Sequence, residues 1–225
     1  METKSPPVLL VLLAALTAIL LLIYGASTVE LVSRPPVVVA PVSKALVVDV
    51  RGPVRLIVNT TGGNGSVVVL KPGVVLTAKH VSGSGGDLYI EPEHIKATLI
   101  RESLKSDLAI LSAPGIGCPC AAVASFGPKV DDTVVVVGFP LNPMVQVQVL
   151  TEGKIHGVTE RGYVTTASAT FGNSGGGVFF GGKLVGILSS LPMQGDGMFG
   201  GVPHNGITFA VDHRTIVDFL GKQFS

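Results

Sequence analysis

The chain has 225 residues, of which 47% are hydrophobic and 14% charged, so it can bury a sizeable core and is not a disordered protein. Its formal net charge is +1, and it lacks tryptophan and any block of basic residues, which excludes the charged and stacking surfaces that bind nucleic acids. Frequent valine, with 29 glycines and 15 prolines, predicts an all-β protein built from short strands and turns.

The N-terminal segment is apolar from residue 8 to residue 23, where Thr17 is the single polar residue. This run is longer than the apolar part of a signal peptide and close to the length that spans a bilayer. We therefore expect residues 1–26 to form a transmembrane signal anchor, with signal-peptidase cleavage at the small residues 25–27 as the alternative. Both outcomes predict that the rest of the chain lies outside the cytoplasm, as a single-pass membrane protein or a secreted one.

A proline-rich stretch follows at residues 27–45 and has the composition of an extended linker. From residue 46 to residue 225, short apolar segments alternate with turns rich in glycine, proline and asparagine. The segments fall into two series of about six or seven, which predicts two six-stranded antiparallel β-barrels at about 46–125 and 126–212. Strands are expected at 46–50, 54–59, 65–70, 74–77, 87–90, 95–101, 108–111, 133–138, 145–151, 153–159, 162–166, 177–180, 184–189 and 207–211. A short amphipathic helix, capped by Asp212, is expected at about 213–221.

One serine lies in a dense glycine cluster, Gly172-Asn173-Ser174-Gly175-Gly176-Gly177, directly before a long apolar stretch. Glycine at this density is used where φ must be positive or where backbones must approach closely. A nucleophilic serine needs both, because its hydroxyl must be exposed and backbone N–H groups must converge where an oxyanion forms. The alternative for the same residues is an ordinary glycine-rich turn between two strands.

A histidine and an aspartate stand at strand ends elsewhere in the chain, His80 after Val74–Thr77 and Asp107 before Leu108–Leu111. A serine hydroxyl is a poor nucleophile at neutral pH, so an imidazole must remove its proton and a carboxylate must orient that imidazole. The chain order of His80, Asp107 and Ser174 is that of the chymotrypsin arrangement, and differs from that of subtilisin and the α/β-hydrolases. Taken singly, His80 and Asp107 could equally be a strand-end histidine and a turn-capping aspartate.

With these motifs the chain resembles the trypsin-like serine proteases, and most closely their HtrA/Deg branch. Residues 137–141 and 206–211 also match, and together the motifs cover about residues 55–220. The resemblance implies a serine endopeptidase of the chymotrypsin fold, ending in a helix, with a catalytic His80, Asp107 and Ser174. The PDZ domain that most HtrA-like proteases carry is not expected in the remaining length, and the oligomeric state is left open.

The resemblance also assigns the oxyanion hole to the backbone N–H groups of Gly172 and Ser174, with Asn173 setting the turn between them. Proteases activated by cleavage carry an aspartate at that position, so an asparagine implies a site that needs no newly cut N-terminus. Phe171 and Gly177 stand where members of the branch usually have proline. A more flexible turn is therefore expected, and with it an activity that is conditional.

Substrate choice is expected to depend on residues before the serine and on the strand after it. Ser168 stands where proteases that cut after Lys or Arg hold an aspartate, and a serine supplies no counter-charge for a basic side chain. We expect cleavage after small or medium aliphatic residues such as Val, Ala or Leu. The other residues expected at the substrate site are Ala169, Phe171, Leu188, Ser189 and Phe209.

Two cysteines, Cys118 and Cys120, flank one proline, and a bridge across it is expected to be strained, so we predict no disulfide between them. A structural zinc site would need two more ligands, which the sequence does not offer at suitable spacing. We expect no metal and no other cofactor.

The expected partners are protein or peptide substrates and, through the N-terminal segment, a membrane. The alternatives to a protease are a protease-fold module that binds peptides without catalysis and an ester hydrolase.

Overall fold

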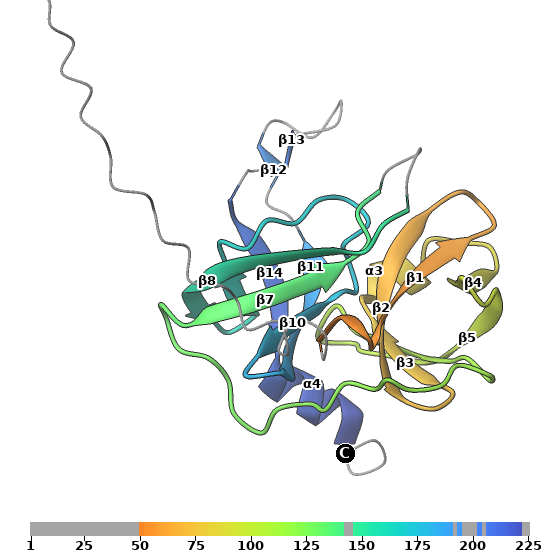
Figure 1. Cartoon of the computed structure of the whole chain (residues 1–225), viewed down its shortest axis with the longest axis horizontal. Helices are drawn as coiled ribbons and strands as arrows, with labels where there is room; N and C mark the ends of the chain where they lie inside the picture. Colours follow the sequence, from red (N-terminus) through yellow and green to blue (C-terminus); the bar gives the residue numbers. More distant parts are fainter. Residues whose placement is uncertain (1–49, 142–145, 191–192, 195–201, 204–205, 222–225) are drawn as a thin grey trace, which may run out of the picture. The chain divides into compact units, whose positions relative to one another are not determined.

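The structure is a computed structural model that describes residues 50–141, 146–190, 193–194, 202–203 and 206–221. It consists mainly of two closed antiparallel barrels of six strands each, as the sequence predicts (Figure 1). The expected anchor and linker lie outside the described residues. Among the residues that are described, no helix combines the length and the apolar character needed to cross a membrane.

The first barrel closes in the order β1-β2-β3-β6-β5-β4 and the second in the order β10-β11-β14-β9-β8-β7. The strands of the first are β1 (Val54–Asn59), β2 (Asn64–Lys71), β3 (Val74–Thr77), β4 (Leu88–Glu91), β5 (Ile95–Glu102) and β6 (Ala109–Ser112). Those of the second are β7 (Thr133–Gly138), β8 (Val149–Thr159), β9 (Gly162–Thr165), β10 (Gly177–Phe180), β11 (Lys183–Ser190) and β14 (Thr208–Asp212). The remaining elements are helices α3 (Lys79–Ser82) and α4 (His213–Leu220) and a two-stranded pair, β12 (Met193–Gln194) and β13 (Val202–Pro203).

Two predicted strands need correction. In place of the two strands expected at 145–151 and 153–159 there is one, β8, because Glu152 and Gly153 both pair with β7 and the chain does not turn between them. A Cβ at Gly153 would lie 2.1 Å from the backbone nitrogen of Ala167, so glycine here permits a close approach between chain segments. Of the strand expected at 46–50, only Val50 is described, and it lies with Arg51 in a helical turn.

The apolar strands are buried on both faces, because the interior of each barrel and the region between the barrels are separate cores. In β2, Val67 and Val69 pack inside the first barrel, whereas Val68 belongs to a cluster shared with the second barrel. In β7, residues 134–137 alternate in the same way between the interior of the second barrel and the shared cluster. Continuous valine runs are the sequence pattern of strands covered on both sides.

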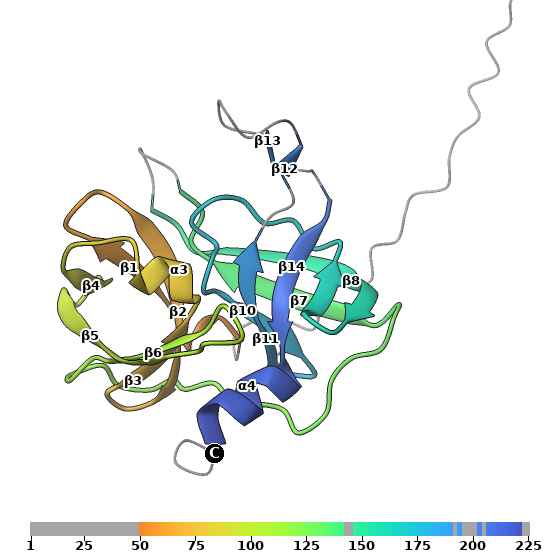
Figure 2. The same ribbon diagram turned by 180° about the vertical axis from the view of Figure 1, so that it is seen from behind.

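Helix α4 packs against both barrels and is capped as predicted. The side chain of Asp212 accepts a hydrogen bond from the N–H of Thr215, 3.0 Å away, and so satisfies a donor of the first turn. Ile216 is buried in the cluster that the two barrels share. From the first barrel, Arg101 donates to the carbonyl of Phe219 and lies over its ring, 4.8 Å from the centroid. Figure 2 shows the helix beneath the strands of the second barrel.

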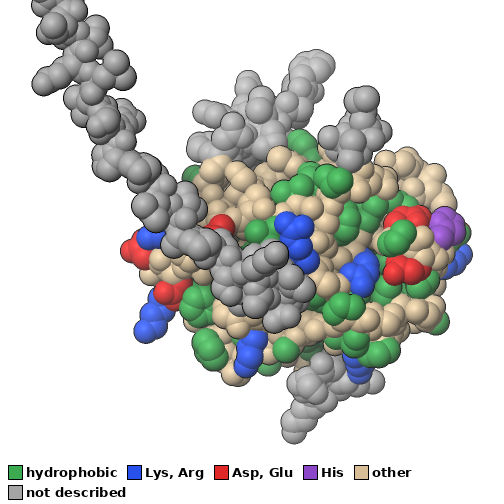
Figure 3. Space-filling view, in the orientation of Figure 1, with side chains coloured by type: hydrophobic (Ala, Val, Ile, Leu, Met, Phe, Trp, Pro, Cys, Tyr) green, Lys and Arg blue, Asp and Glu red, His purple; other side chains and the backbone are tan. Residues whose placement is uncertain are grey.

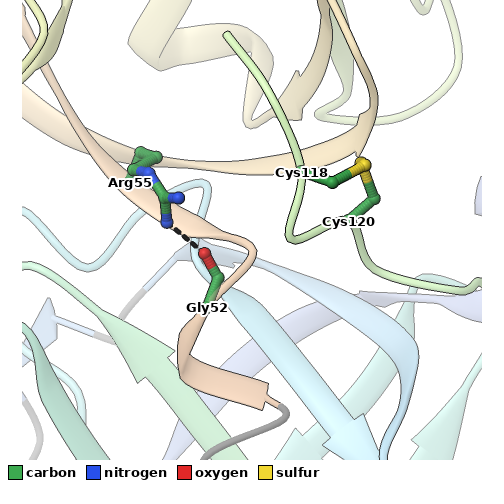
Figure 4. Close-up of a disulfide and its surroundings, with 4 residues drawn as sticks. All are labelled: Gly52, Arg55, Cys118 and Cys120. Atoms are coloured by element: carbon green, nitrogen blue, oxygen red, sulfur yellow. Dashed lines mark hydrogen bonds between the residues drawn. A yellow bond between two sulfur atoms is a disulfide. The ribbon is translucent and has the colours of Figure 1, made fainter.

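The prediction of unpaired cysteines is wrong. Cys118 and Cys120 form a disulfide, drawn in Figure 4, in the connection between the barrels. Their Cα atoms lie 4.6 Å apart, inside the usual range for disulfides, and the intervening Cys118–Pro119 peptide bond is cis. The prediction rested on a strained bridge across Pro119, but the backbone brings the two Cα atoms within the range that a disulfide spans.

Charged groups are distributed sparsely over the surface. On the face drawn in Figure 3, Lys and Arg side chains lie apart from one another and form no continuous basic patch. Exposed apolar side chains are frequent among the described residues, and Leu141 and Phe171 are two examples. The backbones of these two residues are joined by a hydrogen bond from the N–H of Leu141 to the carbonyl of Phe171. These two side chains stand next to the predicted serine turn.

Candidate active site

His80 and Asp107 form a hydrogen-bonded pair. β3 ends just before α3, which carries His80, and β3 pairs with β6, which begins just after Asp107. The strand pairing therefore brings two residues that are 27 positions apart in the sequence into contact. Nδ1 of His80 lies 2.7 Å from Oδ2 of Asp107, and the backbone N–H of His80 donates to Oδ1 at 3.0 Å. The carboxylate thus holds both the ring and the backbone of the histidine.

Ser189, which the sequence assigned to substrate binding, makes a third contact with the same carboxylate. Its hydroxyl donates to Oδ2 of Asp107 over 2.7 Å, from β11 of the second barrel to the loop of the first. Burial alone would raise the pKa of Asp107, but the hydrogen bonds from the His80 ring, the Ser189 hydroxyl and the His80 backbone bring that pKa below its ordinary value. Asp107 is therefore held ionised beside the imidazole.

The loop that carries Asp107 is fastened to the helix that carries His80. Nζ of Lys79 donates to the carbonyl of Ser103 at 3.2 Å and lies 3.5 Å from the carboxylate of Glu102. The hydroxyl of Ser103 in turn accepts the N–H of Ser106, 3.0 Å away, which shapes the turn before Asp107. The motif analysis did not single out Lys79 or Ser103, because their effect depends on contacts between segments that are distant in the sequence.

The turn that carries Ser174 is bound by both barrels. The N–H of Gly175 donates to the carbonyl of Leu188 at 2.8 Å, and the N–H of Leu188 donates to the carbonyl of Gly176 at 2.9 Å. From the first barrel, the N–H of Ser66 donates to the carbonyl of Ser174 at 2.8 Å. The serine turn is therefore a fixed element at the junction of β2 and β11.

The two N–H groups predicted to form the oxyanion hole are free of partners in the described part of the chain. The carbonyl of Phe171 accepts a hydrogen bond from Leu141 at 2.6 Å, and the carbonyl of Asn173 accepts one from within the turn. A trans peptide directs its C=O and N–H to opposite sides, so these bonds direct the N–H group of Gly172 away from Leu141 and that of Ser174 away from Gly176. Gly172 has a φ of +87°, and a Cβ there would lie 2.4 Å from the nitrogen of Leu141. Both features require glycine.

Ser174 and His80 are carried by segments that lie side by side. A Cβ built on Gly65 would lie 3.3 Å from the carbonyl oxygen of Ser174 and 2.7 Å from the side chain of Val81, the residue that follows His80. Within the described residues, the hydroxyl of Ser174 donates no hydrogen bond, to His80 or to any other group. Such bonds are often long before substrate binds and tighten in the complex.

The residues predicted to contact substrate occupy different environments. Ser168 is exposed, and its carbonyl accepts a hydrogen bond from the hydroxyl of Thr151 at 2.7 Å. Ala169 packs on the core of the second barrel, and the side chain of Leu188 is part of that core, with 2% of its surface exposed. Phe171 is half exposed beside the turn, and Phe209 is partly buried in β14. No cluster of His, Cys, Asp and Glu able to hold a metal occurs among the described residues.

Substituting Gly175 by alanine is expected to lower the free energy of unfolding by at least about 3 kcal/mol, because a Cβ would lie 2.0 Å from the carbonyl oxygen of Ser66 at a φ of +82°. Gly181→Ala is the matched control, since it has a φ of +56° with open space around the Cβ and should cost only about 1–2 kcal/mol. Urea denaturation of both variants measures the difference. Equal decreases in the free energy of unfolding for the two variants would show that the serine turn is not packed against β2 as described.

Comparison with protein-family models gives a match over more than half of the chain. A family model described as a trypsin-like peptidase domain matches residues 63–187, which include His80, Asp107 and Ser174. No curated protein matches the sequence.

Among solved structures, the chain is similar to the protease Rv3671c of M. tuberculosis in its active form, with a TM-score of 0.64 and 20% identity over 78% of this chain and 82% of that one. The inactive form of the same protease gives a TM-score of 0.66 and 20% identity, over 78% of this chain and 91% of that one. At such identities the similarity establishes the fold alone, and it does not separate active from inactive forms. The family model, by contrast, spans more than half of the sequence. The chain therefore belongs to the family of the trypsin-like peptidase domain.

Proposed function

We propose that the protein is a serine endopeptidase of the HtrA-like kind that cleaves proteins or peptides, with Ser174 as nucleophile, His80 as general base and Asp107 as the group that orients it. The trypsin-like peptidase fold supports serine protease activity. The observation that carries the proposal is the hydrogen-bonded pair of His80 and Asp107 beside a turn in which Ser174 is accompanied by two free backbone N–H donors.

In the proposed reaction, Oγ of Ser174 attacks the carbonyl carbon of the scissile peptide while Nε2 of His80 accepts the hydroxyl proton. Nδ1–H of His80 remains donated to Asp107, which fixes the tautomer and stabilises the imidazolium. His80 then gives the proton to the leaving nitrogen, the C–N bond breaks, and an acyl-enzyme and a new amino terminus result. A water molecule, deprotonated by His80, hydrolyses the ester and restores the Ser174 hydroxyl.

The negative oxygen of each tetrahedral intermediate would be bound by the N–H groups of Gly172 and Ser174. Their directions are set before substrate arrives, because the carbonyls of the preceding peptides are already hydrogen-bonded. Donors that need no reorientation stabilise a developing charge most effectively, and removing one typically costs about 10²–10³ in kcat.

Labelling with a fluorophosphonate probe tests the proposal. The folded wild-type protein is expected to be labelled, and Ser174→Ala is expected to lose the label entirely. A second candidate, a peptide-binding module without catalysis or with conditional activity, is favoured by the absence of a hydrogen bond from the Ser174 hydroxyl among the described residues. Folded wild-type protein that resists labelling under every condition would support that candidate and exclude the enzyme.

For substrate choice, a peptide with valine before the scissile bond is expected to have a kcat/KM at least about 100-fold above that of the matched arginine peptide. A basic side chain bound next to Ser168 and Ala169 would meet no counter-charge there, because both side chains are neutral. Ser168→Asp is expected to raise turnover of the arginine peptide, and the neutral Ser168→Asn serves as control. A wild-type preference for arginine would refute this assignment.

For location, we propose that residues 1–26 anchor the protein in a membrane as a single-pass protein, with the peptidase domain outside the cytoplasm. The support is the apolar run from residue 8 to residue 23. Alkaline carbonate extraction of membranes tests the anchor. The full chain should stay with the membrane and a chain lacking residues 1–26 should be released, and release of the full chain would indicate cleavage or no anchor.

A further inference from the structure

Ser66 lies at the point where the first barrel meets the serine turn. It belongs to β2, and its side chain is on the same face as Val68, which packs in the cluster shared by the two barrels. It is completely buried, and all its polar groups are used. Its N–H donates to the carbonyl of Ser174, and its carbonyl accepts the hydroxyl of Thr77 at 2.7 Å.

The hydroxyl of Ser66 makes two further hydrogen bonds, both to the second barrel. It donates to the carbonyl of Gly172 at 3.0 Å and accepts the N–H of Phe139 at 2.9 Å. These two partners flank the predicted oxyanion hole. The carbonyl belongs to Gly172 itself. The N–H belongs to Phe139, which begins the segment 139–141, and at the end of that segment the N–H of Leu141 donates to the carbonyl of Phe171.

The peptide groups on both sides of Gly172 therefore depend on one hydroxyl. The peptide after Gly172 is held at its oxygen by Ser66 and at its nitrogen by the carbonyl of Thr170, 3.1 Å from the N–H of Asn173. The peptide before Gly172 is held through residues 139–141. Because glycine rotates freely in φ and ψ, hydrogen bonds to the neighbouring peptides are what keep the Gly172 N–H in one direction.

We propose that Ser66 is a positioning residue for the oxyanion hole: its hydroxyl holds the two peptide groups around Gly172 so that the Gly172 N–H faces the substrate carbonyl. This inference rests on the proposed peptidase function. Without the hydroxyl, the buried carbonyl of Gly172 and the partly buried N–H of Phe139 would both lose their partner. Polar groups left unpaired drive rearrangement towards water or new hydrogen-bond partners, and the Gly172 N–H would turn with them.

The test compares Ser66→Ala with wild type, using an aliphatic peptide substrate, a peptide aldehyde that forms a tetrahedral adduct with the serine, and the product peptide with a free carboxylate. We expect kcat to fall about 10²-fold to 10³-fold with KM changed less than twofold. Affinity for the aldehyde should fall in proportion to kcat, and affinity for the product peptide should stay within twofold. Ser66→Cys, whose thiol is a weaker donor of similar size, should lie between wild type and Ser66→Ala.

Tyr163→Phe is the control for loss of a buried hydrogen bond as such. The hydroxyl of Tyr163 is buried 2.7 Å from Nδ1 of His213, in elements that carry none of the proposed site residues. This variant should lower stability but leave the ratio of aldehyde to product affinity unchanged. The inference is overturned if Ser66→Ala changes that ratio no more than Tyr163→Phe does, or if its kcat stays within twofold of wild type.

Amide hydrogen exchange keeps the inference testable apart from activity. The Leu141 amide, bonded to the carbonyl of Phe171, should exchange at least about tenfold faster in Ser66→Ala and at the wild-type rate in Tyr163→Phe. An inactive, unlabelled wild type with this exchange pattern would refute the proposed function but leave the structural role of Ser66 standing. Unchanged exchange at Leu141 in an active enzyme would refute the role of Ser66 alone.

Discussion

Replacing Ser174 or His80 by alanine is expected to lower kcat for peptide hydrolysis by about 10⁶, and replacing both is expected to lower it no further. The reason is that the hydroxyl and the imidazole act in the same proton transfer, so that loss of one makes the other useless. Kinetics on a purified aliphatic peptide substrate, with inhibitor-treated wild-type enzyme as blank, measure all three variants.

His156→Ala is the matched control, because His156 is an exposed histidine of β8 with no proposed role in catalysis. It should retain activity within twofold of wild type. If the losses of kcat in the two single variants multiply in the double variant, Ser174 and His80 do not act as one unit. The same conclusion follows if Ser174→Ala keeps more than about 1% of wild-type activity.

Asp107→Asn is expected to lower kcat by about 10⁴ while leaving the fold intact. An amide in place of the carboxylate can present a donor to Nδ1 of His80, which stabilises the tautomer that cannot accept the Ser174 proton at Nε2. The same change removes the charge that stabilises the imidazolium. Steady-state kinetics at neutral pH measure the effect, and a loss below tenfold would show that the bond of 2.7 Å between His80 and Asp107 does not orient the base.

The same variant carries a prediction for stability against pH. The pKa of Asp107 is lower in the folded protein than in the unfolded chain, so the unfolded state binds its proton first as the pH falls. The stabilisation by Asp107 is complete above the unfolded pKa of about 3.9 and is lost as the pH drops through the folded pKa. The difference in free energy of unfolding between wild type and Asp107→Asn should therefore shrink in acid. A difference in urea denaturation that stays constant between neutral and acidic pH would contradict the bonding of this carboxylate.

Much of the fold could be predicted from local sequence patterns. Turn residues set the ends of β1, β3, β7 and β10, which match the predicted strands residue for residue. Most other strands shift by one residue, because strand ends depend on their pairing partners as well as on their own residues. A break was predicted at residue 152, within β8, because the pairing with β7 that keeps this strand continuous cannot be read from the residues of the strand alone.

The candidate site was predictable where chemistry depends on residue type, and less so where it depends on packing. The pairing of His80 with Asp107 follows from motifs at strand ends. The hydrogen bonds from Ser189 to Asp107 and from Ser66 to Gly172 join the two barrels. The first pair is separated by 82 positions in the sequence and the second by 106. In the sequence, Ser66 is distinguished only as a polar residue before an apolar run, and the orientation of the barrels decides that its hydroxyl reaches the serine turn.

The most direct measurement of the central claim is a crystal structure of the protein after reaction with a fluorophosphonate. We expect phosphorus bonded to Oγ of Ser174, with one phosphonyl oxygen about 2.7–3.1 Å from the nitrogens of both Gly172 and Ser174. The His80 ring should lie against the adduct and remain bonded to Asp107. An adduct on another residue, or an oxygen that points into solvent while the Gly172 N–H faces the protein, would contradict the account.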